Sequence, residues 1–197
     1  IRNEFFKILT IPGASDSLHV LDQLGVLTLL MPELETMKGL AQGMHHDYTL
    51  WEHSLKTVHF AETILHQLSH YFPQYAESLA IHFRQEVEND ITRIPLLLLT
   101  ALLHDSGKPL TRSVIDHQIH FYRHEQVGSD LNQKIARRFK LGKKTARIIT
   151  QATAHHLRLL NQYRPAGISH RVTYRFFRDL DDAALDTLIL IPVSYTH

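Results

Sequence analysis

Apolar residues recur at spacings of three and four along most of this chain, a period that predicts α-helices over most of its length. In residues 50–71 the apolar positions form one stripe, which indicates an amphipathic helix packed on a core. Residues 95–103 are apolar at almost every position, as expected for a buried helix. The predicted helices are residues 4–9, 15–24, 25–31, 50–71, 75–89, 94–105, 125–139, 143–157, 169–180 and 183–191.

Residues 111–122 depart from this helical period. Apolar residues on both sides flank the polar stretch Asp116-His117-Gln118, which predicts a short β-hairpin. The chain has no repeat and no low-complexity linker. These patterns together predict an all-α fold, in the form of a helical bundle with one short β-hairpin.

The composition is that of an ordinary globular domain. With 197 residues, 44% of them hydrophobic, the chain can form one substantial core or two small ones. Lys and Arg number 21 against 20 Asp and Glu, so the net charge of +1 provides no general attraction for nucleic acid. Cysteine is absent, and neither a leader nor a membrane-length apolar run is present, so we expect a cytoplasmic protein that does not enter a membrane.

The apolar helix at residues 94–105 ends in His104 and Asp105. Gly107 is suited to the left-handed conformation that closes a helix, and Pro109 prevents the helix from continuing. An imidazole and a carboxylate at the end of a buried helix destabilise the fold by several kcal/mol unless they are paired, hydrogen-bonded or ligated. We therefore expect partners for them elsewhere in the chain, either in a structural hydrogen-bonded pair or at a metal ion.

Candidate partners are found among the 16 histidines of the chain. His53 lies beside the apolar stripe of the helix at residues 50–71, His124 lies where the hairpin gives way to a helix, and His155 and His156 end another helix. Imidazole and carboxylate ligands suit a divalent transition metal (Mn, Fe, Co, Ni or Zn) better than Ca or Mg. Structural readings remain open for each residue: His124 can simply begin a helix, and at least one of the adjacent pair His155 and His156 should be structural.

Three ordered blocks carry a resemblance to a known family: Trp51-Glu52-His53-Ser54-Leu55, Leu102-Leu103-His104-Asp105-Ser106-Gly107-Lys108-Pro109 and His120-Phe121-Tyr122-Arg123-His124-Glu125-Gln126-Val127-Gly128. They resemble the HD-domain superfamily of metal-dependent phosphohydrolases. Within it, they resemble the HD region of the bacterial tRNA nucleotidyltransferase and poly(A) polymerase family. Residues 3–34 resemble the helical segment that precedes the HD domain in that family, and residues 174–180 also match.

The resemblance implies roles for individual residues. His53, His104 and Asp105 match ligands of the principal metal site, while His124 and one or both of His155 and His156 match positions that hold a second ion. Asp105 and Lys108 are then catalytic, and Lys108 and Arg123 bind substrate, with Lys108 facing its phosphate. The family's fourth principal ligand is an aspartate near the end of the last helix, and here Ser194 stands at the aligned position. A neutral hydroxyl does not provide the charge of a carboxylate.

The resemblance also divides the chain. Residues 1–43 correspond to the neck of a nucleotidyltransferase and residues 44–191 to an HD domain, with a nucleotidyltransferase domain expected upstream. Residues 192–197 match the translation of a transposon end used in sequencing libraries, so we expect them to be a non-native tail.

The expected function is that of a phosphohydrolase using one or two divalent ions. It would act on a phosphomonoester or a 2′,3′-cyclic phosphodiester of a nucleotide or RNA end. The alternative is a noncatalytic module of a nucleotidyltransferase that positions tRNA or forms a homodimer. The basic stretch at residues 137–147 is either a solvated face or a contact for an RNA backbone.

Overall fold

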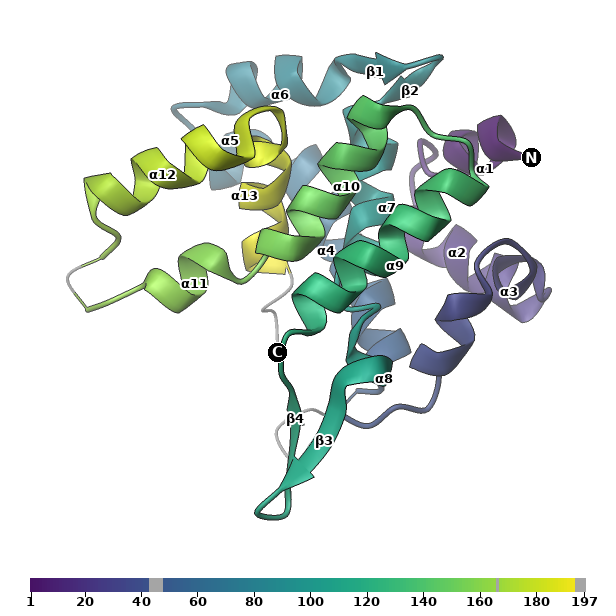
Figure 1. Ribbon diagram of the computed structural model, residues 1–197. Helices are drawn as coiled ribbons and strands as arrows, with labels where there is room; N and C mark the ends of the chain where they lie inside the picture. Colours follow the sequence, from purple (N-terminus) through teal and green to yellow (C-terminus); the bar gives the residue numbers. More distant parts are fainter. Residues whose placement is uncertain (43–47, 166, 194–197) are drawn as a thin grey trace.

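The computed structural model describes residues 1–42, 48–165 and 167–193, with the side chain of Val193 excepted (Figure 1). It confirms the expected all-α bundle. The helices are α1 (Arg2–Ile8), α2 (Ala14–Gln23), α3 (Val26–Leu30), α4 (Leu50–His66), α5 (Leu68–Tyr71), α6 (Ala76–Arg84), α7 (Arg93–Leu103), α8 (Lys108–Thr111), α9 (His124–Arg138), α10 (Lys143–His155), α11 (Arg158–Gln162), α12 (His170–Leu180) and α13 (Ala184–Val193), with the 3-10 helices η1 (Pro32–Met37) and η2 (Asp181–Ala183).

Helix α7 is the centre of the bundle. Every residue from Pro95 to Leu103 is buried, and α4, α6, α10 and α13 pack around the helix. Burial of a leucine side chain stabilises a fold by about 1.5–3 kcal/mol, so this run of leucines holds α7 firmly in place. The helix ends at Leu103, two residues before its predicted end, with His104 as its C-cap, and the next residue is Asp105.

Helix α4 begins at a capping box. The Thr49 side chain accepts a hydrogen bond from the Glu52 backbone nitrogen, and the Glu52 carboxylate accepts one from the Thr49 backbone nitrogen at 2.8 Å. This cap places His53 at the end of the first turn, on the buried side of the helix. The prediction of one helix over residues 50–71 was wrong at Gln67, where α4 ends and the short helix α5 follows.

The predicted hairpin is confirmed. Strands β3 (Arg112–Ile115) and β4 (Gln118–Phe121) pair antiparallel, with Arg112 opposite Phe121 and Ile115 opposite Gln118. Figure 1 shows them projecting from the body of the bundle beside α8 and α9. Both turn residues between the strands have positive φ angles, as two-residue hairpin turns require.

A second hairpin, β1 (Glu86–Glu88) with β2 (Ile91–Thr92), was not predicted. The helix expected over residues 75–89 ends at Arg84 instead. Asn89 and Asp90 both have positive φ angles, so they form a two-residue turn that reverses the chain.

The N-terminal helices share the core of the bundle. Phe5 and Phe6 of α1 pack on Phe139, with ring centroids 5.4 and 6.5 Å away, and all belong to the cluster that contains α7. The predicted domain boundary at residues 43 and 44 lies outside the described residues. At the other end, α13 continues to Val193 with Pro192 inside it, two residues beyond its predicted end.

Candidate metal centre

Four helices bring one carboxylate and four imidazoles together in the interior. His53 comes from the first turn of α4 and His104 from the end of α7, followed directly by Asp105. His124 is the first residue of α9, and His156 is the C-cap of α10. All five side chains are buried, so these groups face one another in the absence of bulk water.

The Asp105 carboxylate lies in the middle of the cluster. Its Oδ2 is 3.4 Å from His53 Nε2 and 3.1 Å from His104 Nε2. Its Oδ1 is 3.2 Å from His124 Nε2 and 3.6 Å from His156 Nε2. The five residues therefore form two trios that share Asp105, each with ligand atoms close enough to hold one ion.

The tautomers of three of these histidines follow from their hydrogen bonds. The Nδ1 atoms of His104, His124 and His156 lie 2.8, 2.7 and 2.7 Å from the backbone carbonyl oxygen three residues earlier. A carbonyl oxygen only accepts, so each Nδ1 carries the proton that it donates. In the neutral ring Nε2 then holds a lone pair, and this lone pair faces a carboxylate oxygen, which is also an acceptor.

Two acceptors that face each other require a proton or a cation between them. The donor set of imidazole nitrogens and carboxylate oxygens is the one that a divalent transition metal prefers. A ligating histidine usually donates its other ring N–H to a backbone carbonyl or a carboxylate, as His104, His124 and His156 do here. The residues therefore fit the metal ions expected from the sequence.

Burial and the neighbouring carboxylate shift the pKa values of these histidines in opposite directions. Burial lowers the pKa of His53 to about 4 and that of His156 to about 3, so both rings are neutral near pH 7. Burial opposes the charged form of His124, but the hydrogen bond to Asp105 raises its pKa above the ordinary value. Burial alone would raise the pKa of Asp105, yet its electrostatic interactions with His104 and Lys108 hold it well below the ordinary value.

Lys108 is tied into the cluster by two short contacts. Its Nζ lies 2.7 Å from Asp105 Oδ2 and 2.7 Å from Gln42 Oε1, from the segment before α4. The ammonium group thus balances the buried carboxylate in this structure. It lies beside the carboxylate oxygen that also faces His53 and His104.

The role predicted for Gly107 was wrong. Its φ of −80° is right-handed, so no left-handed closure occurs there. A Cβ at this position would overlap the carbonyl oxygen of His124 and the nitrogen of Gly128, which shows that glycine is needed for close approach of two backbones. Pro109 follows in the first turn of α8, where proline is well tolerated.

Two sequence-predicted site residues are not part of the cluster, and a third cannot be placed. His155 is half-buried and belongs to neither trio, and its pKa is lowered by burial and by Arg158. Arg123 is exposed, with a left-handed backbone (φ 62°) that turns the chain from β4 into α9. Ser194 lies outside the described residues.

Asn132 was missed by the sequence analysis. This fully buried side chain of α9 donates to the Leu103 carbonyl at 3.2 Å and to Thr153 Oγ1 at 2.9 Å, and it accepts from Ser106 Oγ at 3.0 Å. It therefore joins the end of α7 to α9 and α10, the helices that carry His124 and His156. The available signal was a polar residue on the inner stripe of α9.

Within the described residues, no helix is both long enough and apolar enough to cross a membrane.

Comparison with known proteins identifies the family. The model of the HD domain family matches residues 50–183, which include all five residues of the cluster. An A-adding tRNA nucleotidyltransferase of Deinococcus radiodurans is 31% identical over 166 residues, which cover 81% of this chain and 32% of that protein. A CC-adding tRNA nucleotidyltransferase of Thermus thermophilus is 27% identical over 195 residues, which cover 97% of this chain and 37% of that protein.

For a third relative, the match covers a smaller share of the other protein. The bifunctional uridylyltransferase/uridylyl-removing enzyme of Ruegeria pomeroyi is 28% identical over 179 residues, which cover 89% of this chain and 18% of that protein. The chain thus spans about a third of the length of the two tRNA nucleotidyltransferases. Because the family model covers most of the chain, this protein belongs to the HD domain family.

Proposed function

We propose that this chain is a metal-dependent phosphohydrolase domain. Its substrate would be a phosphomonoester or a 2′,3′-cyclic phosphodiester of a nucleotide or RNA end, and the domain would be part of a tRNA nucleotidyltransferase-like protein. One observation carries the proposal: a single buried carboxylate faces the Nε2 atoms of four histidines, three of which are held as acceptors.

The roles of the residues follow from the two trios. His53, His104 and Asp105 would hold the principal ion, and Asp105, His124 and His156 a second one. Divalent ions there would neutralise phosphate oxygens and lower the pKa of nearby water. Lys108 would exchange its contact with Asp105 for a non-bridging phosphate oxygen once an ion balances the carboxylate.

Arg123 offers a second positive charge to the substrate. It is exposed, has no ion pair among the described residues and directly precedes His124. We assign it, with Lys108, to binding the substrate phosphate. Its left-handed backbone is a sparsely populated conformation for arginine, of the kind that accumulates at functional sites.

The names of the relatives support both hydrolysis and an alternative. One is named for removing a uridylyl group, which accords with a hydrolytic site. Two are named for adding nucleotides to tRNA, which accords with a noncatalytic module that positions tRNA or joins two subunits. The buried cluster of ligands favours the hydrolase, because a purely structural module has no need for acceptors that face each other.

Metal analysis combined with turnover tests the proposal. The purified chain is expected to bind Mn, Fe, Co, Ni or Zn and to hydrolyse p-nitrophenyl phosphate or 2′,3′-cyclic AMP. Asp105→Asn removes the charge that both trios share, so metal affinity and turnover should fall by about 100-fold or more. Asp130→Asn, an exposed acid on α9, is the matched control and should leave both unchanged.

Two results would contradict the hydrolase. One is a chain that binds no transition metal, and the other is full turnover in Asp105→Asn. A metal-free chain that binds tRNA or dimerises without turnover would instead support the module.

A further inference from the structure

The charges of this protein are strongly segregated along the sequence. Residues 131–178 contain 12 of the 21 Lys and Arg and none of the 20 Asp and Glu. The near-zero net charge therefore conceals a strongly basic stretch within an acidic remainder. The basic residues of the stretch are Lys134, Arg137, Arg138, Lys140, Lys143, Lys144, Arg147, Arg158, Arg164, Arg171, Arg175 and Arg178.

Most of these cations are exposed and lack an acidic partner. Acids are contacted by Arg138, Lys144, Arg158 and Arg178. The other eight are exposed and form no ion pair within the part of the chain that the structure describes. Seven of them lie on or beside the adjacent helices α9 and α10 or on α12, and we call these seven the basic face: Lys134, Arg137, Lys140, Lys143, Arg147, Arg171 and Arg175.

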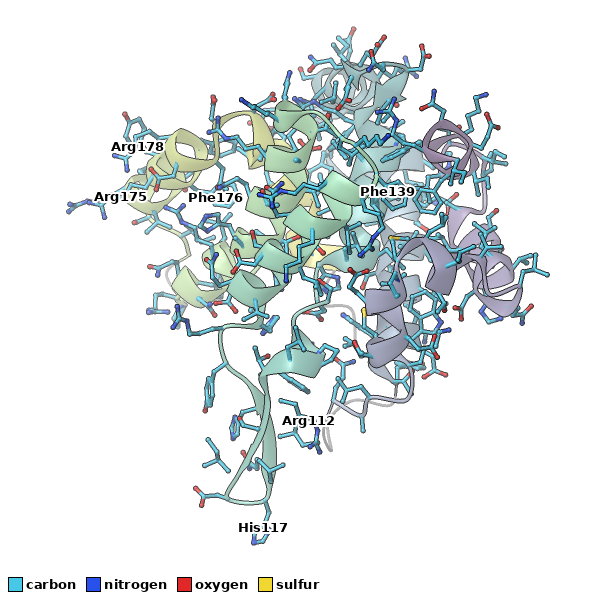
Figure 2. All side chains as sticks on the ribbon, turned by 45° about the vertical axis from the view of Figure 1, so that its right-hand side comes forward. Arg112, His117, Phe139, Arg175, Phe176 and Arg178 are labelled. Carbon is cyan, nitrogen blue, oxygen red and sulfur yellow. The ribbon has the colours of Figure 1, made fainter. Side chains whose placement is uncertain are left out.

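Helix α12 turns its arginines away from the body. It buries Phe176 and Leu180 along one stripe, while Arg171, Arg175 and Arg178 lie on the opposite side at helical spacing. Figure 2 shows Arg175 and Arg178 extending away from the bundle. Tyr174, which is 66% exposed, lies beside Arg178, whose guanidinium is 6.0 Å from its ring centroid.

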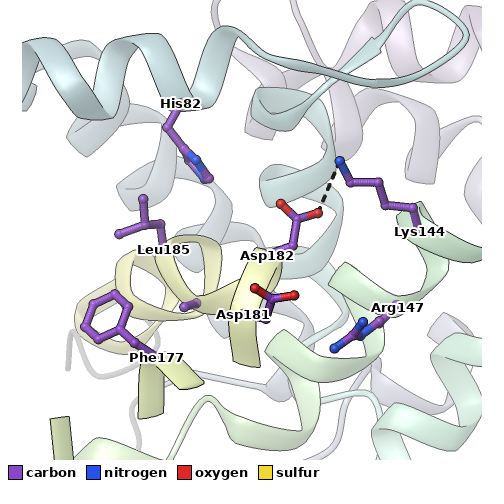
Figure 3. A pocket seen from close by; sticks show the side chains of 8 residues that line it. His82, Lys144, Arg147, Phe177, Asp181, Asp182 and Leu185 are labelled. Atoms are coloured by element: carbon purple, nitrogen blue, oxygen red, sulfur yellow. Dashed lines mark ion pairs between the residues drawn. The ribbon is translucent and has the colours of Figure 1, made fainter. Parts of the chain in front are cut away.

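A cavity of about 710 Å³ lies between α10 and α12 (Figure 3). Lys144 and Arg147 line it from α10, and Phe177, 40% exposed, lines it from α12. Asp182 also lines it, but its charge is balanced by Lys144 at 3.3 Å and by Arg93. Asp181 is the remaining acid of the lining, and it is exposed with no ion pair among the described residues.

We propose that the basic face binds the sugar-phosphate backbone of RNA without reading its sequence. Arginine is well suited to phosphate, and exposed aromatic rings beside a basic groove provide surfaces on which bases stack. The positive charge itself would suit any polyanion. The choice of RNA among polyanions rests on the proposed function.

The same helices connect the basic face to the metal centre. Helix α10 carries Arg147 near its start and is followed by His156, nine residues later, about 14 Å along the helix axis. Helix α9 likewise begins at His124 and carries Arg137 near its end. Measured along the helix axes, Arg147 and Arg137 therefore lie about 14 and about 20 Å from the ligands that the same helices position.

Fluorescence anisotropy with a labelled tRNA transcript, measured over a range of salt concentrations, tests the proposal. The double variant Arg147→Gln Arg175→Gln is expected to bind about tenfold more weakly, with the slope of log K against log salt reduced by about 1 to 2. Asp181→Asn removes an acid from the cavity lining and should bind about twofold to threefold more tightly. A variant that is merely destabilised would not gain affinity.

Two controls separate this surface from the metal centre and from general charge effects. Arg84→Gln, an exposed cation at the end of α6, should leave the affinity unchanged. Asp105→Asn should lose hydrolysis and keep RNA binding, so failure of the proposed hydrolase does not remove the RNA site. A double variant that binds like Arg84→Gln would overturn the proposal. Equal affinity for polyglutamate or for phosphatidylserine vesicles would overturn the assignment to RNA.

Discussion

Asp105 is the residue that most determines what this protein can bind. It is 2% exposed and contacts four imidazoles and one ammonium group. Its importance was predictable, because a charged residue at the end of a run of leucines needs partners. It was not predictable that His156, and not the adjacent His155, would belong to the second trio. This membership depends on how the last turn of α10 is oriented against α7, which is set by tertiary packing.

We expect the stability of the metal-free protein to fall with acidity. The pKa values of His53 and His156, about 4 and about 3 when folded, lie below the 6.5 expected for the unfolded chain. As the pH falls below 6.5 the unfolded chain takes up protons that the folded chain does not, so acid favours unfolding. The opposite shift of His124 reduces this effect.

Between pH 7 and pH 5 the free energy of unfolding should drop by roughly 2–4 kcal/mol. Urea denaturation after dialysis against a chelator measures it. His156→Gln should make the pH dependence shallower, and a flat profile for the unmodified chain would contradict the prediction.

Gly107→Ala should weaken both folding and metal binding. The new Cβ would push against backbone atoms of His124 and Gly128, and overpacking of this kind typically costs about 1–3 kcal/mol. Movement of His124 would then shift its Nε2 away from the other ligand atoms of the second trio and lower the metal affinity. Calorimetric titration with Mn²⁺ and thermal unfolding measure the two effects.

Gly39→Ala provides the contrast. Its φ of 69° strains an alanine by about 1 kcal/mol, but a Cβ there meets no atom within 4 Å, so it touches no ligand backbone. It should therefore lower stability while leaving metal affinity unchanged. Equal losses of metal affinity in both variants would refute the close-approach explanation.

At the scale of elements, the long periodic helices were predictable and the short irregular ones were not. The apolar period identified α4, α7, α9, α10, α12 and α13 to within a few residues, apart from the break at Gln67. Strand β1 has three residues, and its Glu-Val-Glu sequence continues the amphipathic pattern of α6. Such a segment becomes a strand only because the following turn returns β2 to it.

Arg93 fixes the start of α7 to the start of α13. This arginine is 1% exposed, and its guanidinium contacts the carboxylates of Asp182 and Asp186, the latter at 2.7 Å. Arg93→Met should lower the free energy of unfolding by about 3–5 kcal/mol, because Asp186 remains buried without its main counter-charge.

A double-mutant cycle measured by chemical denaturation checks this pairing. Arg93→Met combined with Asp186→Asn should be more stable than the sum of the two single losses implies, since the second change removes the unpaired charge. Simple additivity would show that the two residues do not act together.

At the scale of the whole molecule, the metal centre links four helices that are far apart in the sequence. A divalent metal held by both trios would bind only when these helices are assembled, so at saturation it should stabilise the folded state. At a free concentration 100 times its dissociation constant the gain is about 2.7 kcal/mol. Thermal unfolding with and without Mn²⁺ measures it, and Asp105→Asn should show no gain. An equal shift in that variant would place the ion elsewhere.

The net charge of this protein does not reveal how unevenly its charges are distributed over the molecule. A sum of +1 excludes a strong overall field, yet the basic face is visible once charges are counted along the chain and placed on α9, α10 and α12. Exposure and ion pairing then decide which cations are available, and neither property can be obtained from composition.

One consequence follows from the way a single aspartate serves both trios. The two oxygens of Asp105 face different pairs of histidines, and they are joined through one carbon atom. Any two ions held by these trios would therefore depend on the position of one side chain. A shift of the end of α7 would consequently disturb both trios at once, and neither could be lost or retuned independently of the other through this residue.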